Sequence, residues 1–288
     1  MLEKFILVIK GFIMGIANII PGVSGGTLAI ILGIYEEFIG AISHFFSNFK
    51  ENIKFLIPLG IGMILSIITM SSVIDYSYKN FPIPTTLFFV GLVIGGIPLL
   101  YGKVKDNKEE KKNPINYLIM SLTFALVIFM AFADKVFGGL GEVVLSNLGF
   151  GGYVLLFLVG MMAAATMVIP GVSGSLVLML LGYYYPIIAL IKEIVSFNNL
   201  FANMIVAGVF GVGVLVGIVL VSKLIEFLFQ KYEINTYYGV LGFIFASIIA
   251  IPITSFTSVS VTFDLLQVII GVFVAMIGFV IAYKLGEK

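Results

Sequence analysis

Six apolar segments, each long enough to cross a lipid bilayer, constrain this chain more than any other feature of its sequence. They lie at residues 55–74, 83–101, 114–133, 201–221, 237–253 and 265–283. A helix needs about 20 apolar residues to cross the hydrocarbon core of a membrane, whereas a strand needs about 10. Backbone groups inside that core must bond within the protein, which a helix achieves by itself. The segments therefore predict an all-α integral membrane protein.

Composition agrees with this class and excludes several kinds of chemistry. Hydrophobic residues make up 60% of the 288 residues and charged residues only 11%, which is typical of membrane proteins. The chain has no Cys and one His, so disulfides, thiol catalysis and clusters of histidine metal ligands are excluded. We expect no metal, no cofactor and no nucleic acid, and the net charge of +1 does not indicate a partner.

A Pro-Gly-Val-Ser-Gly motif occurs twice within apolar sequence. Residues 11–39 align without a gap with residues 160–188, and 11 of the 29 positions are identical. Proline and glycine interrupt helices, and an interrupted helix in lipid must find partners for its freed backbone groups. A helix that restarts after the motif points unpaired N–H groups and the positive end of its dipole into the membrane. These features predict that the two motifs bind an anion.

The predicted substrate-binding residues are those of the two motifs and one lysine in the preceding helix. They are Pro21, Gly22, Val23, Ser24, Gly25, Gly26, Thr27, Pro170, Gly171, Val172, Ser173, Gly174, Ser175 and Lys10. A structural interpretation stands beside the functional one, because glycine and serine also allow helices to pack closely. Lys10 is likewise suited to extending its amine to the membrane surface.

The two copies divide the chain into similar halves. Each motif joins two apolar arms, at residues 5–20 and 23–40 and at residues 153–169 and 172–191. The first pair is shorter than a comfortable span and predicts a re-entrant hairpin, with tilted spans as the alternative. A hairpin followed by three crossings moves the chain to the other side of the membrane. We therefore expect one membrane domain, residues 1–288, of two inverted-topology repeats, residues 1–135 and 150–288, with the site near the midplane.

Lysine positions predict the orientation. All 16 basic residues are lysines, and 13 of them fall on the side that holds both termini in this topology. Because cytoplasmic loops carry the excess of positive charge, we expect a multi-pass protein of the cell membrane with cytoplasmic N- and C-termini. Tyrosines in two runs, at 183–185 and 237–238, are expected to be aromatic anchors at the membrane surface.

The repeated motif, its Leu-Gly-x-Tyr continuation at residues 32–35 and 181–184, and Lys10-Gly11-Phe12-Ile13-Met14-Gly15 resemble the polyprenyl-phosphate transporters, over nearly the whole chain. The resemblance implies a translocase that flips undecaprenyl phosphate, or another polyprenyl phosphate, from the outer to the inner leaflet for recycling of the envelope lipid carrier. Members of that family often carry Asp where this chain has Asn18, so the resemblance adds Asn18 to the substrate-binding residues. A charge at that position is then not essential to transport, or this member is tuned differently.

Other functions remain open from the sequence alone. Interrupted helices would equally serve a secondary transporter of a small soluble anion or amino acid, and a structural membrane subunit would also fit. An enzyme is disfavoured, because the motif lacks the Gly-Lys-Ser/Thr ending of a P-loop and no clustered His, Cys or carboxylates supply a catalytic group. For transport coupled to H⁺ or Na⁺, Glu36 and Glu37 are the candidate carboxylates, with solvation at the headgroup level as the alternative.

Overall fold

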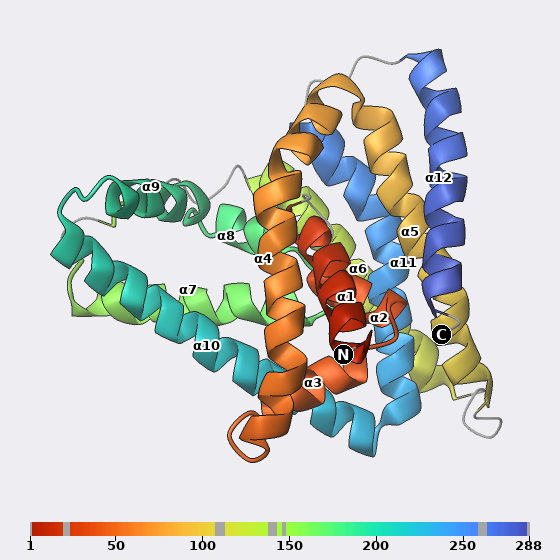
Figure 1. The fold of residues 1–288 in the computed structure, drawn as a ribbon, viewed down its shortest axis with the longest axis horizontal. Coiled ribbons are helices and arrows are strands. Elements are labelled where there is room, and N and C mark those ends of the chain that lie inside the picture. Colours follow the sequence, from red (N-terminus) through yellow and green to blue (C-terminus); the bar gives the residue numbers. More distant parts are fainter. Residues whose placement is uncertain are drawn as a thin grey trace.

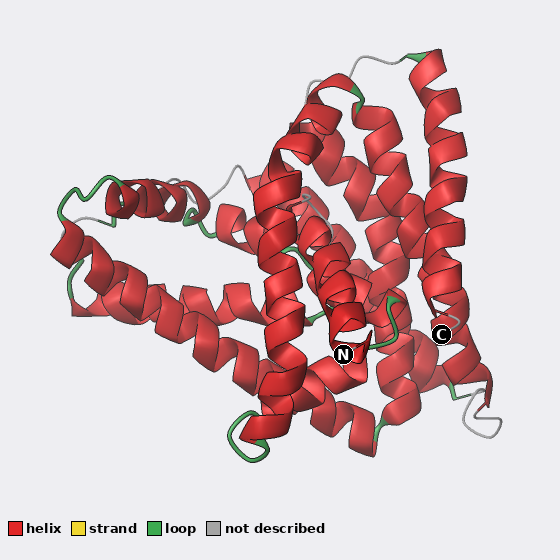
Figure 2. Ribbon diagram, viewed as in Figure 1, coloured by secondary structure: helices red, strands yellow, loops and turns green. Residues whose placement is uncertain are grey.

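The computed structural model describes residues 2–19, 24–106, 113–137, 143–145, 148–258 and 264–286, and within them every regular element is a helix (Figure 2). The helices of the first half are α1 (Leu2–Ile19), α2 (Gly25–Ile31), α3 (Tyr35–Ser43), α4 (Phe49–Asn80), α5 (Pro82–Asp106) and α6 (Pro114–Phe137). Those of the second half are α7 (Phe150–Val168), α8 (Gly174–Leu180), α9 (Tyr184–Val195), α10 (Leu200–Lys231), α11 (Glu233–Ser258) and α12 (Leu265–Gly286). The all-α prediction is confirmed.

Seven of these helices are long and apolar enough to cross a membrane, namely α4, α5, α6, α7, α10, α11 and α12. The six predicted crossings are therefore confirmed, and α7, the first arm of the second hairpin, joins them. Helices α4 and α10 contain 32 residues each, or about 48 Å at 1.5 Å per residue. They exceed the hydrocarbon core of about 30 Å and so extend beyond it or cross it at a tilt.

Helices of the two halves pack in matching pairs. Within each half the first helix lies along the first long crossing, α1 against α4 and α7 against α10, while α5 packs against α12 and α6 against α11 across the halves. Glycines allow these close approaches, because a methyl group on Gly91 would collide with the carbonyl of Ala275, and one on Gly213 with the carbonyl of Phe157. The third crossing of each half is thus held by the other half.

Both arms that follow a motif, predicted as apolar arms over residues 23–40 and 172–191, are themselves broken into two helices. Gly33, two residues after the end of α2, has φ of 66°, and Gly182, two residues after the end of α8, has φ of 74°. After α2 the N–H of Ile34 donates to the carbonyl of Ala29 at 3.0 Å and the N–H of Gly33 to that of Ile30 at 2.9 Å, the bonding of a Schellman cap. Glycine favours this left-handed conformation, so each arm turns at its glycine. Helices α8 and α9 meet there at an angle of 106°.

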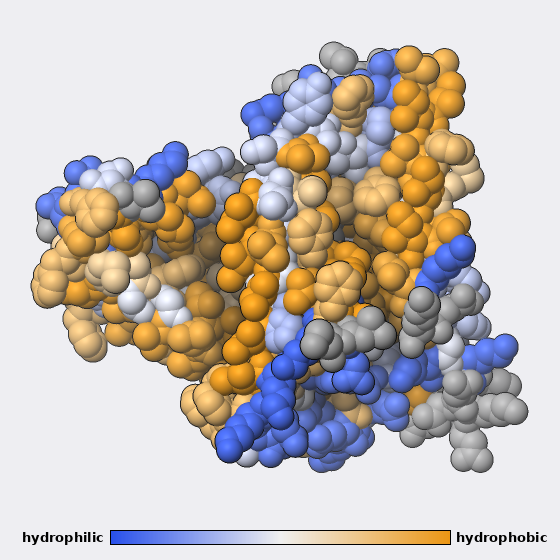
Figure 3. Space-filling view, in the orientation of Figure 1, coloured by the Kyte–Doolittle hydropathy of each residue, from blue (hydrophilic) through white to orange (hydrophobic). Residues whose placement is uncertain are grey.

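Two of the long helices extend away from the others. In Figure 1, α7 and α10 lie side by side and extend to the left, away from the nearly upright α4, α5, α11 and α12. The start of α1, the turn between α3 and α4, and the C-terminal ends of α5, α10 and α12 all lie in the lower half of the view. Figure 3 shows hydrophilic residues gathered in the lower part of the molecule and hydrophobic residues over the flanks of the helices above them. The ends that were predicted to share one side of the membrane therefore lie together.

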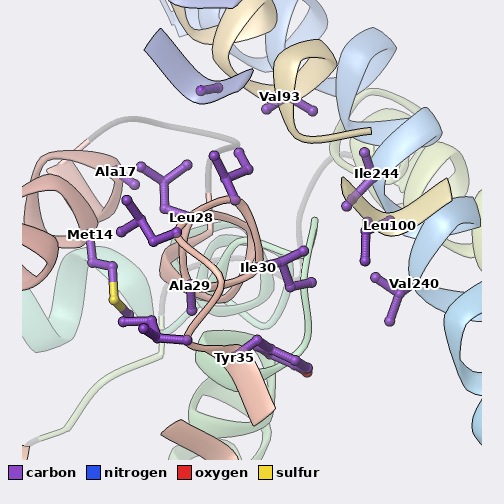
Figure 4. Packing of buried hydrophobic residues seen from close by; sticks show 14 of the residues in the cluster. Met14, Ala17, Leu28, Ala29, Ile30, Tyr35, Val93, Leu100, Val240 and Ile244 are labelled. Atoms are coloured by element: carbon purple, nitrogen blue, oxygen red, sulfur yellow. The ribbon is translucent and has the colours of Figure 1, made fainter. Parts of the chain in front are cut away.

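Helix α2 lies at the centre of the largest hydrophobic core. All seven of its residues are buried, and Leu28 and Ile30 pack in one cluster with Met14 of α1, Val93 of α5 and Ile244 of α11 (Figure 4). Its counterpart α8 has only one buried residue among its seven, Val177. The helix that follows the first motif is therefore embedded more deeply in the protein than the helix that follows the second.

Candidate functional site

The first motif ends in a capped helix start. Pro21, Gly22 and Val23 lie outside the described residues, but Ser24 occupies the N-cap position of α2 with extended backbone angles, φ −105° and ψ 138°. Its Oγ accepts a hydrogen bond from the Gly26 N–H at 3.2 Å. As expected for the N-cap residue, the serine satisfies an N–H that the first helical turn leaves free. The chain thus restarts a helix directly after the motif, as predicted.

The second motif interrupts the chain between α7 and α8. Gly171 has φ of 78°, a left-handed conformation that favours glycine. Ser173 stands at the N-cap position of α8 with φ −92° and ψ 126°, and the hydroxyls of Ser173 and Ser175 form a hydrogen bond of 2.8 Å. Pro170, Gly171, Val172 and Ser173 are buried, so this interruption also lies inside the protein.

Hydrogen bonds join the two motifs directly. Ser24 Oγ donates to the carbonyl of Ile169 at 3.1 Å, and the Gly171 N–H donates to Thr27 Oγ1 at 2.8 Å. The hydroxyl of Tyr35, at the start of α3, donates to the carbonyl of Val168 at 3.1 Å. Segments that are 133 to 145 residues apart in sequence therefore meet, and we call this set of contacts the motif junction.

Glycines bring the backbones together at the motif junction. A methyl group on Gly26 would lie 2.6 Å from the carbonyl oxygen of Val168, and one on Gly171 would lie 2.7 Å from that of Phe243. Real Cβ atoms do not approach other atoms so closely, and a backbone carbonyl cannot move aside easily. At these two positions the structural interpretation of the motif, close packing, holds whether or not the residues also contact a ligand.

Asn18 and Lys10, which were predicted to bind substrate together with the motifs, lie in different places relative to the first motif. Asn18 is exposed and lies beside Gly25, because a methyl group on Gly25 would be 2.8 Å from Asn18 Oδ1. Lys10 instead donates from Nζ to the carbonyl of Leu32 at 2.9 Å. Leu32 follows the far end of α2, about 12 Å along the helix axis from Ser24. The structure therefore brings Asn18, but not Lys10, to the first motif.

The candidate coupling carboxylates lie just beyond the end of α2. Glu36 Oε1 accepts a hydrogen bond from the hydroxyl of Tyr237 at 2.6 Å and lies 3.7 Å from Lys103 Nζ. These residues and Glu37 line a cavity of about 440 Å³, and both glutamates are exposed. Glu36 thus has a donor and a cation beside it, in an open cavity on the α3 side of the motif junction.

Two tyrosines of this region, Tyr237 and Tyr35, were not predicted as site residues. Tyr237 was predicted to anchor the protein at the membrane surface, but that prediction is wrong, since the side chain is 3% exposed and donates to Glu36. Tyr238 beside it is buried as well. Tyr35 was visible as the last residue of Leu-Gly-x-Tyr. The sequence does not show, however, that this residue lies against Val168. Only the recurrence of this tyrosine after both motifs could have drawn attention to it.

These features define a multi-pass helical membrane protein in which two interrupted helices meet inside the protein, an arrangement known from secondary transporters. A family model described as undecaprenyl phosphate translocase-like matches residues 14–264. The chain belongs to this family.

Curated relatives cover most of the chain. A polyprenyl-phosphate transporter of Staphylococcus aureus is 34% identical over 285 residues, which are 99% of this chain and 96% of the relative. A polyprenyl-phosphate transporter of Vibrio cholerae is 27% identical over 240 residues, or 78% of this chain and 70% of the relative. No solved structure matches this chain.

Proposed function

We propose that this protein carries polyprenyl phosphate across the cell membrane, moving undecaprenyl phosphate or a related lipid from the outer to the inner leaflet so that the carrier is reused. The names of its two relatives support the substrate class. The observation that carries the proposal is the motif junction, because the hydrogen bonds that join the two interrupted helices there are bonds that a phosphate could replace. In this proposal the chain is a carrier and not an enzyme.

Phosphate binding requires the motif junction to open. The hydroxyl of Ser24 donates to the carbonyl of Ile169 and the N–H of Gly171 donates to Thr27 Oγ1, so these two donors become available to a phosphate only when the two motifs separate. A neutral hydrogen bond contributes about 0.5–1.5 kcal/mol, whereas a bond to a charged acceptor is roughly twice as strong. A phosphate that accepts from the Gly171 N–H and from the freed hydroxyls, with Ser173 and Ser175 beside them, therefore offsets the contacts that it replaces.

Alternating access follows if the two halves have inverted topology, residues 1–135 against residues 150–288, with both termini in the cytoplasm. Inward transport of a lipid phosphate moves negative charge against an inside-negative potential, at about 2.3 kcal/mol per charge and 100 mV. We propose that Glu36, with Glu37 beside it, carries an H⁺ or Na⁺ that offsets this charge. The hydrogen bond from Tyr237 makes Glu36 the stronger candidate of the two, and the ammonium of Lys103 at 3.7 Å has to move away before the carboxylate binds a cation.

Reconstitution in sealed liposomes tests the transport function. A polyprenyl phosphate with a fluorescent group is placed in the outer leaflet, and its accessibility to a membrane-impermeant quencher is followed over time. We expect a protein-dependent loss of accessibility that a phosphatidylglycerol carrying the same fluorophore does not show. Uptake of soluble phosphate or amino acids without any change in the lipid probe would instead support a transporter of small soluble molecules.

A further inference from the structure

An apolar cavity of about 660 Å³ lies between α6, α10 and α11. Its walls include Ile119 of α6, Leu228 of α10 and Val240 of α11. Its volume falls within the range of about 300–1,000 Å³ that is usual for sites binding small molecules. The hydrocarbon walls suit an apolar ligand and offer little to an ion or a sugar.

The deep end of this cavity is the motif junction. Tyr35, Ile169 and Pro170 line it there, and Tyr35 donates to Val168. The residue that follows Pro170 is Gly171, whose N–H is bonded to Thr27. A group that fills the deep end of the cavity therefore lies against the hydrogen bonds that join the two motifs.

The opposite end of the cavity is polar and lies where helices begin and end. Asn235 and Thr236 of the first turns of α11 line it, and both side chains are bonded within the protein, to Asn116 Oδ1 at 3.0 Å and to the carbonyl of Tyr232 at 2.8 Å. From Asn235 to Phe243 the cavity follows about 12 Å of α11. It thus extends from the end of the helix bundle to the interrupted helix.

One wall of the cavity is incomplete. Ile115 and Leu224 line it but are 48% and 55% exposed on the surface of the protein. That surface is apolar and belongs to helices long enough to cross the membrane. The cavity therefore opens sideways toward lipid, and a long hydrocarbon chain can lie partly in the cavity and partly in the bilayer.

We infer that this cavity binds the isoprenoid segment next to the phosphate of the transported lipid, an inference that rests on the proposed function. The cavity is continuous with the motif junction, so a chain in it extends from a phosphate held there. Its length of about 12 Å is well below the hydrocarbon core of about 30 Å, so the rest of a long chain remains in lipid. The protein then selects its substrate by the near end of the chain as well as by the phosphate.

Gly239 provides a substitution that fills the cavity without disturbing the backbone. It lines the cavity, and a methyl group added to it would lie 3.4 Å from Ile119 Cγ2 and 3.7 Å from Thr123 Cγ2, which are tolerable contacts. Gly239→Leu therefore projects a branched side chain into the space. Gly211→Leu is the matched control, because nothing lies within 4 Å of a methyl group there and Gly211 does not line this cavity.

The experiment measures binding of farnesyl phosphate and of isopentenyl phosphate to the full-length protein in nanodiscs. Because one methylene in an apolar pocket changes affinity by about tenfold or more, we expect Gly239→Leu to weaken farnesyl phosphate binding at least about tenfold. Isopentenyl phosphate, which has the phosphate but only a short chain, should bind the variant and the wild type alike. Gly211→Leu should leave both affinities unchanged.

Photolabelling of the wild-type protein provides a second readout that needs no variant. A farnesyl phosphate with a diazirine near its phosphate should label α6, α10 and α11 at residues lining the cavity, and a phosphatidylglycerol carrying the same group should not. Labelling elsewhere, equal labelling by both lipids, or unchanged binding by Gly239→Leu would overturn the inference. If the wild type binds neither prenyl phosphate more tightly than the matching alcohol, the proposed function itself fails.

Discussion

The hydroxyl of Ser24 is used twice in the motif junction. Its proton is donated to the carbonyl of Ile169, and its oxygen accepts the N–H of Gly26. A hydroxyl has only one proton to donate, so an anion can receive it only after Ile169 has been released. Under the proposed function, anion binding by Ser24 would therefore be coupled to separation of the two motifs, which a carrier with two conformations requires.

Thr27→Val tests the junction at the neighbouring hydroxyl. The substitution keeps the shape of the side chain but leaves the buried N–H of Gly171 without its acceptor. An unsatisfied buried donor costs about 1–3 kcal/mol, so we expect a lower unfolding temperature and slower flipping in liposomes. The control is Thr69→Val, because Thr69 is exposed on α4 and bonds within its own helix. Equal unfolding temperatures for the two variants would contradict a stabilising role for the junction.

At the scale of single elements, the break in each arm that follows a motif sets the length of the short helix α2 or α8. Gly33 and Gly182 end α2 and α8 after seven residues, and both breaks carry the same cap bonding. The break places Tyr35, the first residue of α3, against the end of α7. The short helix and its cap therefore position one of the hydrogen bonds that join the halves.

Gly33→Ala tests whether the left-handed conformation is required. Nothing lies within 4 Å of a methyl group on Gly33, so the cost is conformational, roughly 1–2 kcal/mol for an L-residue with positive φ. Gly40→Ala is the matched control, because Gly40 also has open space around it but lies within α3, where alanine is favoured by about 0.5–1 kcal/mol. Unfolding in detergent should show opposite signs for the two variants. Stabilisation by both would show that the cap is not needed.

The sequence predicted elements well where length or composition decides them and poorly where a distant contact decides. Apolar length located the crossings, and Pro-Gly located the interruptions, although the N-cap role of Ser24 was not predicted. Gly33 belongs to the repeat, but the sequence does not identify it as a residue that ends a helix, because only its backbone angle shows the break. The bonds of Lys10 to Leu32 and of Tyr237 to Glu36 join residues far apart in sequence. No periodicity within either segment encodes such a pair.

At the scale of the whole molecule, the two halves are joined by exchanged helices. Helix α6 packs against α11 and α12 against α5, so neither half can move without changing contacts in the other. The cavity between α6, α10 and α11 includes residues of both halves. A relative movement of the halves would therefore alter the cavity and the motif junction together.

Cysteine labelling tests how the molecule lies in the membrane. The chain contains no cysteine, so Lys79→Cys at the end of α4 and Lys105→Cys at the end of α5 can be labelled singly. These ends lie at opposite edges of the molecule (Figure 1), and the lysine distribution predicts that Lys105 faces the cytoplasm. In intact cells an impermeant maleimide should react with the Lys79→Cys protein and, only after permeabilisation, with the Lys105→Cys protein. The reverse pattern would invert the proposed orientation.

The last prediction concerns the energy of transport. One negative charge that crosses the whole field inward costs about 2.3 kcal/mol per 100 mV, and a proton or Na⁺ carried with it cancels that cost. In the proposed mechanism Glu36, which accepts a hydrogen bond from Tyr237, carries this cation, while the second copy of the motif has Tyr185 and Pro186 at the positions that match Glu36 and Glu37. The proposal therefore assigns coupling to one half only.

Glu36→Gln should abolish the acceleration of inward flipping by an imposed H⁺ or Na⁺ gradient, while flipping down a lipid gradient persists. Glu51→Gln, which neutralises an exposed glutamate at the start of α4, should keep the acceleration. Tyr237→Phe removes the hydroxyl donor to Glu36 but retains the carboxylate, so it should shift the ion concentration needed for acceleration without abolishing it. If the wild type flips the lipid at the same rate with and without either gradient, Glu36 carries no ion and the lipid gradient alone drives transport.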